Sequence, residues 1–247
     1  MEKEKFLKNC ELLLAAYNSG KLGQTKMPED SNPENFETKE LRLSYFTLPM
    51  ALNYQRDSYK LWEAALKTYN DPETKIVFDV KKVSEMSEDN LRNYLTKYKL
   101  ALQPNKHIQT WKTIAGTIFS EFGSFSNLIQ FSEGDFLKLR ELIQKKYKKG
   151  FPYLSGPKIF NYWAFILTKY GGEKLKNSQF IEIAPDTHIT KCSVVLGVIS
   201  DKEAETLSKE KISERWRELL KNSKLNPIDL HPPLWFWSRN GFVFNLT

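Results

Sequence analysis

The sequence Pro152-Tyr-Leu-Ser-Gly-Pro-Lys158 precedes an apolar segment, and a second short stretch, Ala184-Pro-Asp-Thr-His188, follows it. The first stretch predicts a tight turn that opens a helix over 157–170. Glycine permits backbone conformations closed to other residues, and proline is favoured at the first helical position. The second stretch predicts another helix start with Asp186 as its N-cap. We therefore expect a lysine and a carboxylate at the starts of two successive helices.

The rest of the chain carries the hydrophobic spacing of helices, which predicts an all-α, mainly helical architecture. Residues 20–38 are polar and predict a loop. Ile76-Val-Phe-Asp-Val80 has the composition of a strand, although its length also allows an extended lead-in to a helix. The other expected helices cover 4–17, two segments within 40–70, a helix capped by Ser87 that runs to about Leu100, 106–122 ending at Gly123, 133–147, 187–198, 209–222 and 233–240.

Length and composition indicate a globular protein with a sizeable core. The 247 residues suffice for one large domain or two small lobes, and 40% hydrophobic with 27% charged residues is ordinary for such a chain. The formal net charge of +7 makes a polyanion a reasonable partner. Lys145, Lys146, Lys148 and Lys149 stand just before the predicted turn and add sequence-independent attraction to DNA.

Several classes of site are not expected. Cys10 and Cys192 cannot supply the four thiolates of an iron–sulfur cluster or an all-cysteine zinc site. The three histidines lack metal-ligand spacing, so we expect neither a metal nor a cofactor. The start Met1-Glu-Lys-Glu-Lys5 lacks a signal-peptide core, and no apolar run reaches the ~18 residues of a membrane span. These features predict an intracellular protein, cytoplasmic or nuclear, without membrane contact.

Lys158 is a candidate nucleophile. The positive end of the helix dipole disfavours an ammonium group, and partial burial would lower its pKa further. A neutral amine near pH 7 meets the condition for nucleophilic attack. The alternative is a solvated lysine whose stem packs on Tyr162. Backbone N–H groups at the turn and the helix start could also hold a phosphate.

Asp186 has two compatible roles. As an N-cap it receives helix N–H groups that stabilise its negative charge. Such an anion would also stabilise the cationic sugar that forms when a base leaves DNA, or activate the attacking nucleophile. His188 suits packing or a phosphate contact better than a role as general base.

Large aromatic side chains gather near the C-terminal end. Trp235 and Trp237 lie on nearly opposite sides of the helix predicted there, so both cannot point into one core. Trp235 could stack on an extruded base, an interaction worth ~1–3 kcal/mol. The alternative is that both rings bury against the first helices. In the 53–56 segment, Gln55 could read a base edge, while Tyr54 is expected to pack.

These residues resemble the helix-hairpin-helix DNA glycosylase superfamily, the group of endonuclease III and the 8-oxoguanine glycosylases. That family carries Leu-Pro-Gly-x-Gly-x-Lys, a helix, and then x-Asp-x-His at the start of another helix. Gly156-Pro157-Lys158 and Asp186-Thr-His188 match the last parts of this pattern. The resemblance implies that Lys158 is the Schiff-base nucleophile and Asp186 the catalytic acid. The archaeal 8-oxoguanine glycosylases are the most similar subgroup, through segments resembling 51–55 with Trp62, 158–162 and 234–239.

The chain departs from the family in three respects. The gap from Lys158 to Asp186 is longer than in endonuclease III, which predicts an insertion at 171–183. In other registers Phe160 or Phe151 takes the place of the lysine, with Lys149 near the latter, and the enzyme would then use Asp186 with water. His231 stands where the archaeal group has an acidic residue, so the identity of the damaged base stays open.

The resemblance implies a two-lobed helix-hairpin-helix glycosylase fold, with a DNA-binding cleft between a central lobe at 75–187 and a lobe formed by 1–74 and 188–247. We expect a monomer that removes a damaged base, an oxidised purine such as 8-oxoguanine, from double-stranded DNA and cleaves the strand as an AP lyase. Three alternatives stay open: a monofunctional glycosylase for alkylated or deaminated bases, a non-catalytic helix-hairpin-helix DNA-binding module, and a basic protein with an unrelated partner. The expected base-binding residues are Trp235, Gln55 and His231, and the expected DNA-backbone contacts are Leu154, Ser155, Gly156, Lys149 and His188.

Overall fold

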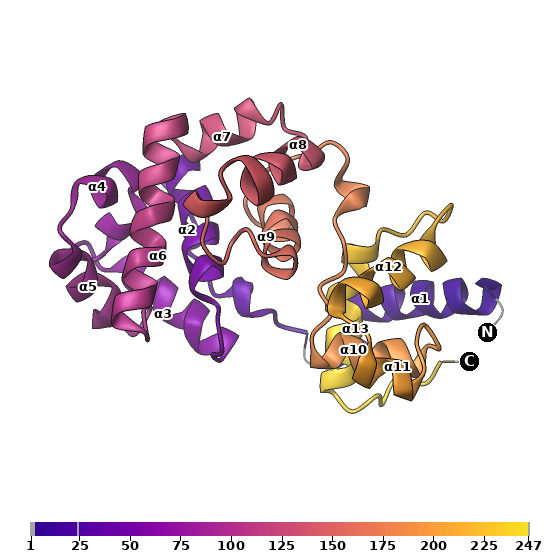
Figure 1. Ribbon diagram of the computed structural model, residues 1–247. Coiled ribbons are helices and arrows are strands. Elements are labelled where there is room, and N and C mark those ends of the chain that lie inside the picture. Colours follow the sequence, from indigo (N-terminus) through magenta and orange to yellow (C-terminus); the bar gives the residue numbers. More distant parts are fainter. Residues whose placement is uncertain (1–2, 24, 247) are drawn as a thin grey trace. The chain divides into compact units, whose positions relative to one another are not determined.

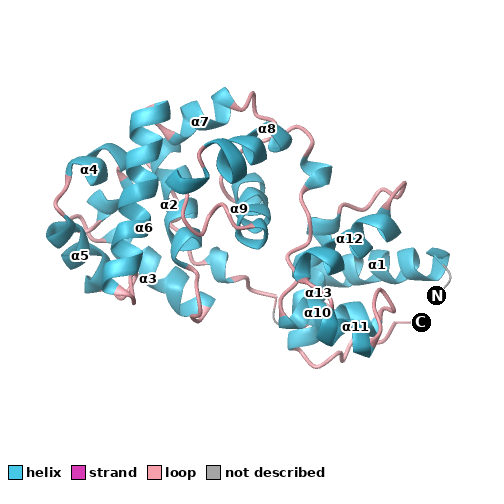
Figure 2. Ribbon diagram, in the orientation of Figure 1, coloured by secondary structure: helices cyan, strands magenta, loops and turns pink. Residues whose placement is uncertain are grey.

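The computed structural model describes residues 3–23 and 25–246, which form 13 α-helices and no strand (Figures 1 and 2). The predicted all-α class is thereby confirmed. The chain divides into two compact units: a terminal unit made of Met1–Lys26 and Gln179–Thr247, and a central unit made of Met27–Ser178. The sequence grouped residues 27–74 with the chain ends, whereas the compact central unit includes them.

The central unit is built around α2, whose residues are all buried from Leu43 to Leu52. This helix packs against α3, α6, α7 and α9, so it occupies the middle of the unit. The Trp163 indole Nε1–H of α9 donates a hydrogen bond of 2.9 Å to the Thr47 hydroxyl of α2, both groups being buried. The helices of this unit are α2 (Lys39–Leu52), α3 (Ser58–Asn70), α4 (Val80–Glu85), α5 (Glu88–Lys97), α6 (Pro104–Thr117), α7 (Phe125–Phe131), α8 (Phe136–Glu141) and α9 (Pro157–Lys169).

The terminal unit joins the two ends of the chain around a core of its own. Helix α13 packs against both α1 and α10, which brings the first helix beside the last one. The fully buried Trp216 donates its Nε1–H to the Ser193 hydroxyl at 2.8 Å. The helices of this unit are α1 (Lys3–Asn18), α10 (Thr187–Val195), α11 (Asp201–Thr206), α12 (Lys209–Leu220) and α13 (His231–Arg239).

Most of these helices begin at a side chain that satisfies a free backbone N–H of the first turn. The predicted cap Ser87 accepts from the Asn90 N–H, and Asp186 accepts from the Ile189 N–H. Helix starts are thus encoded locally, and the predicted N-terminal boundaries fall close to the observed ones. The capping side chains are Thr38, Asp57, Asp79, Ser87, Ser124, Asp135, Asp186, Ser200 and Ser208.

Some elements differ from the prediction. Residues 75–78 form a short 3-10 helix rather than a strand or an extended lead-in, and Asp79 then caps α4. The helix predicted over 133–147 begins only at Phe136, because Glu133 and Gly134 adopt left-handed φ values of 56° and 61°. The predicted end at Gly123 is confirmed, since its φ of 79° stops the π-helical turn that extends α6. The short helices α7 and α11 were not predicted.

None of the helices in the described part of the chain is both long and apolar enough to cross a membrane.

Candidate nucleic-acid site

The turn before α9 is closed by its own backbone hydrogen bonds. The Ser155 N–H donates to the Phe151 carbonyl and the Gly156 N–H to the Tyr153 carbonyl, both at 2.9 Å. Leu154 is fully buried and Ser155 is 9% exposed, so neither side chain is prominent at the surface. The amides of Ser155 and Gly156 are therefore already engaged within the turn.

The reason for glycine in this turn differs from the predicted one. Gly156 has an ordinary φ of −64°, and the left-handed residue is Tyr153 with a φ of 61°. A Cβ atom at Gly156 would lie 3.1 Å from the Tyr153 carbonyl oxygen. Glycine is therefore favoured by this close approach rather than by its own backbone conformation.

Lys158 lies in the first turn of α9, as predicted, but its side chain is exposed. The partial burial on which its activation was argued is therefore absent. By helix geometry the amides of Lys158 and Ile159 lack partners within α9, and Gly156, the N-cap, has no side chain to accept from them. These two amides are the ones at the helix start that could bind a phosphate.

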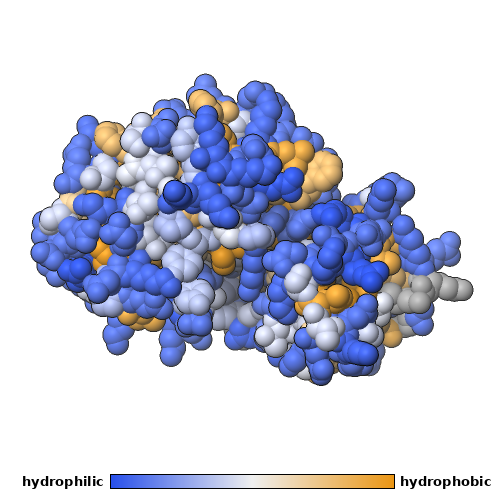
Figure 3. All heavy atoms as spheres, viewed as in Figure 1, coloured by the Kyte–Doolittle hydropathy of each residue, from blue (hydrophilic) through white to orange (hydrophobic). Residues whose placement is uncertain are grey.

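The lysine run before the turn has a mixed character. Lys148 and Lys149 are exposed on a short 3-10 turn, while Lys145 pairs with Glu141 at 2.8 Å. The Lys146 ammonium lies over the Tyr147 ring, 5.1 Å from its centroid. Figure 3 shows hydrophilic side chains over most of the face in view. A charged, exposed run of this kind is compatible with a nucleic-acid backbone.

The two alternative registers place buried phenylalanines where the family has its lysine. Phe160 is fully buried and stacks on Phe136, with ring centroids 5.6 Å apart. Phe151 is fully buried as well. In either register, the residue that replaces the family's lysine is a buried phenylalanine in the core of the central unit.

Asp186 connects the start of α10 with α13. Its Oδ1 accepts from the Ile189 N–H at 2.9 Å, which caps α10. Its Oδ2 accepts from the Trp235 Nε1–H at 3.1 Å. Both carboxylate oxygens thus have a donor, and the negative charge is stabilised at a fixed position on the helix N-terminus.

The Trp235 indole packs against the core of the terminal unit and also contacts a cation and a histidine. The Arg239 guanidinium lies 4.7 Å from its ring centroid, and His188 meets it edge-on at 5.3 Å. The His188 Nδ1 is in turn 3.1 Å from the Ser238 hydroxyl. The Arg239 guanidinium thus covers part of the indole, and the residue as a whole is only partly exposed. Arg239 was not among the expected site residues, although its spacing from Trp235 is one helical turn.

The negative charge of Asp186 also acts on a buried thiol. Burial first, and the Asp186 carboxylate second, raise the pKa of Cys192 to about 12, and burial likewise raises the pKa of Cys10 to about 12. Both cysteines are free and stay protonated at neutral pH. Neither therefore supplies a thiolate nucleophile.

The remaining aromatic and base-reading candidates are Trp237, His231, Gln55 and Tyr54. Trp237 is buried and donates its Nε1–H to the Phe244 carbonyl at 2.8 Å, so it belongs to the core of the terminal unit. His231 is also buried, with 6% exposed, one helical turn before Trp235. Gln55 is exposed on the loop between α2 and α3 with a φ of 50°. Tyr54 beside it packs against Tyr153, as expected, with ring centroids 5.4 Å apart, and is 41% exposed.

The structure therefore brings Trp235 to the neighbouring pair Asp186 and His188, from which it is far apart in sequence. They belong to the terminal unit with His231, whereas Lys158 belongs to the central unit. The other expected contacts of the central unit are Lys149, Leu154, Ser155, Gly156 and Gln55.

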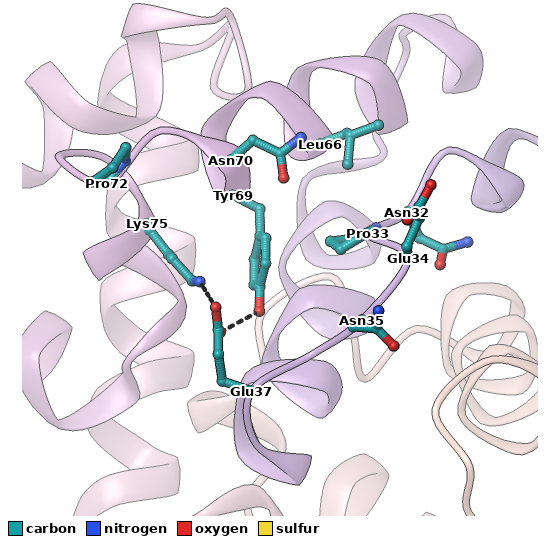
Figure 4. A pocket seen from close by; sticks show the side chains of 10 residues that line it. All are labelled: Asn32, Pro33, Glu34, Asn35, Glu37, Leu66, Tyr69, Asn70, Pro72 and Lys75. Carbon is teal, nitrogen blue, oxygen red and sulfur yellow. Dashed lines mark hydrogen bonds and ion pairs between the residues drawn. The ribbon is translucent and has the colours of Figure 1, made fainter.

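A polar hollow of about 720 Å³ lies elsewhere in the central unit, between the 32–37 loop and α3 (Figure 4). Glu37 is one of its lining residues, and its carboxylate accepts from the Tyr69 hydroxyl at 2.8 Å and pairs with Lys75. None of the expected site residues lines this hollow. Among the described residues, no group of three or more His, Cys, Asp and Glu side chains is arranged to hold a metal ion.

No known protein family matches the chain, and no curated protein is significantly similar to it.

Proposed function

We propose that this protein is a DNA glycosylase of the helix-hairpin-helix type that releases a damaged base, an oxidised purine such as 8-oxoguanine, from double-stranded DNA. The observation that carries the proposal is the Asp186 carboxylate, fixed by the Ile189 amide and the Trp235 indole. It supplies a positioned negative charge beside a partly exposed aromatic ring. Those are the two parts that base excision needs: an anion for the departing base's sugar and a surface for the extruded base.

In this mechanism Asp186 acts while the sugar–base bond breaks. The bonding electron pair leaves with the base, which takes up a proton, and positive charge develops on the sugar. The fixed carboxylate stabilises that charge without reorganising, because its hydrogen-bond donors already hold it. The base, flipped from the duplex at a cost of a few kcal/mol, stacks on the exposed part of the Trp235 ring.

Lys158 carries the associated lyase step. Its unprotonated amine attacks the sugar C1′ as the base leaves, and the ring oxygen takes a proton when the sugar opens to a Schiff base. The strand then breaks by elimination of the 3′ phosphate. Lys158 is exposed and stands at the start of α9, next to free amides suited to a DNA phosphate.

A second candidate is a monofunctional glycosylase, which releases alkylated or deaminated bases and uses water activated by Asp186. The exposure of Lys158 favours it, because the side chain has no buried environment that would activate it as a nucleophile. It predicts base release without a covalent intermediate.

Two measurements test the proposal. A panel of duplexes, each with one modified base, is incubated with the protein, and free base and cleaved strand are measured separately. We expect release of at least one base, lost in Asp186→Asn. A protein that binds the duplexes but releases nothing would be a non-catalytic DNA-binding module.

Borohydride reduction with a lesion-containing duplex tests the lyase step. We expect a trapped covalent complex that disappears in Lys158→Gln and persists in Lys149→Gln, an exposed lysine of the neighbouring run. The reverse result would assign the nucleophile to Lys149. Base release with no trapped complex in the wild type would establish the monofunctional reaction.

A further inference from the structure

Two tyrosines and a lysine from three separate segments meet on the central unit. Tyr54 follows α2, Lys106 lies in the first turn of α6, and Tyr153 lies in the turn before α9. The two ring centroids are 5.4 Å apart. The Lys106 ammonium lies 5.0 Å from the Tyr54 centroid and 4.8 Å from the Tyr153 centroid. We call these three residues the Tyr-Lys-Tyr cluster.

The backbone around the Tyr-Lys-Tyr cluster is held in an unusual conformation. Tyr153 itself and Gln55, next to Tyr54, both adopt left-handed φ values, which cost free energy in residues other than glycine. The Arg56 guanidinium donates to the Leu100 carbonyl at 2.6 Å and so fastens the Tyr54 loop to the segment that follows α5. The close approach of Gly156 fixes the Tyr153 carbonyl. The rings are therefore positioned before any ligand arrives.

The Tyr-Lys-Tyr cluster is also exposed and positively charged. Tyr54 is 41% exposed, which makes it one of the few large exposed hydrophobic side chains in the described chain. None of the ion pairs between described residues involves Lys106. The Lys106 ammonium therefore contacts ring faces rather than a carboxylate, so it can still bind an anion.

We propose that the Tyr-Lys-Tyr cluster binds an unpaired nucleotide, with a base stacked on Tyr54 and Tyr153 and the adjoining phosphate contacted by Lys106. Aromatic rings next to a cation are the general means of binding single strands, because every base has a face that stacks and every nucleotide a phosphate. Positioned rings lower the entropic cost of that contact. The inference rests on the proposed function only in taking a nucleic acid as the ligand.

The test is binding of a labelled oligothymidine to the full chain, followed by fluorescence anisotropy at low salt. We expect Tyr54→Ala to weaken binding about 5- to 150-fold. Tyr153→Asn should also weaken it, since asparagine tolerates the left-handed backbone and removes the ring. Phe180→Ala is the control, because Phe180 is similarly exposed at 44% and lies outside the cluster. It should bind like the wild type.

Lys106→Gln provides a second readout. Loss of one phosphate contact should lower the slope of log affinity against log salt by about 0.7 on single-stranded DNA. An unchanged slope would overturn the role given to Lys106. Circular dichroism checks that each variant is folded.

The outcome also separates this inference from the proposed function. If Tyr54→Ala binds oligothymidine as well as Phe180→Ala does, the inference is wrong, whether or not base release is observed. If the wild type binds through Tyr54 but releases no base from any duplex, the glycosylase proposal is wrong and the inference stands.

Discussion

The hydrogen bond between Asp186 and Trp235 should couple α10 to α13 energetically. A hydrogen bond to a charged group contributes ~1.5–3 kcal/mol, and loss of an N-cap costs ~1 kcal/mol. Asp186→Ala removes both and should reduce the free energy of unfolding by about 2–4 kcal/mol. Trp235→Phe removes the indole N–H and some packing while leaving the cap intact.

A double-mutant cycle isolates the coupling free energy between Asp186 and Trp235. The two single changes and the double change are compared by urea unfolding, followed by far-UV circular dichroism. Packing lost in Trp235→Phe occurs with and without Asp186, so it cancels. The coupling should be about 1–2 kcal/mol, because solvent partly compensates a partly exposed indole.

The matched control is Asp79→Ala, which removes the cap of α4 in the central unit. Combined with Trp235→Phe, it should be additive, because the two side chains share no partner. If the cycle with Asp186 is additive as well, the hydrogen bond contributes nothing to stability, and the fixed position of the carboxylate loses its support.

Two further predictions concern the central unit. Burial raises the pKa of Glu29 to about 7. The folded state therefore holds a proton that the unfolded state releases near 4.5, so stability is greatest below that pH and falls as the pH rises to about 7. Glu29→Gln should remove up to about 3 kcal/mol of this pH dependence of stability. The urea midpoints of wild type and variant are compared at pH 5 and pH 8. An equal change in midpoint between these pH values in both proteins would refute the prediction. Gly150→Ala should destabilise the protein by about 1–3 kcal/mol, because its Cβ would lie 2.5 Å from the Thr117 hydroxyl oxygen. Gly116→Ala has free space around the added Cβ and should stabilise α6, and both effects are measured by thermal unfolding. Equal melting temperatures for the two alanine variants would contradict the steric argument.

The helices that could be predicted from sequence are those whose signals are local. Spacing of apolar residues and a capping side chain fix the start of α5 at Ser87 and of α10 at Asp186 within a few residues. The 75–78 segment was misassigned because its β-branched residues favour strands only when a partner strand is present. In this fold the residues of the 75–78 segment pack against helices, and a short helical turn packs their side chains as well as a strand would.

The contact between Asp186 and Trp235 could not be predicted, because it joins residues 49 positions apart. Helical spacing shows which side of a helix a residue occupies, yet it carries no information on which other helix lies against that side. The pairing of α10 with α13 is a property of the packed terminal unit.

In the turn before α9, the local structure was predicted correctly but for the wrong physical reason. Glycine was assigned the unusual backbone conformation because it tolerates one most easily. The structure gives that conformation to Tyr153, which places its ring against Tyr54, and gives Gly156 the role of leaving room for the carbonyl behind it. Tyr153 bears this cost while its ring lies against Tyr54 and beneath the Lys106 ammonium. For this reason the Tyr153 side of the turn, together with Lys158, is where contact with DNA should be sought first.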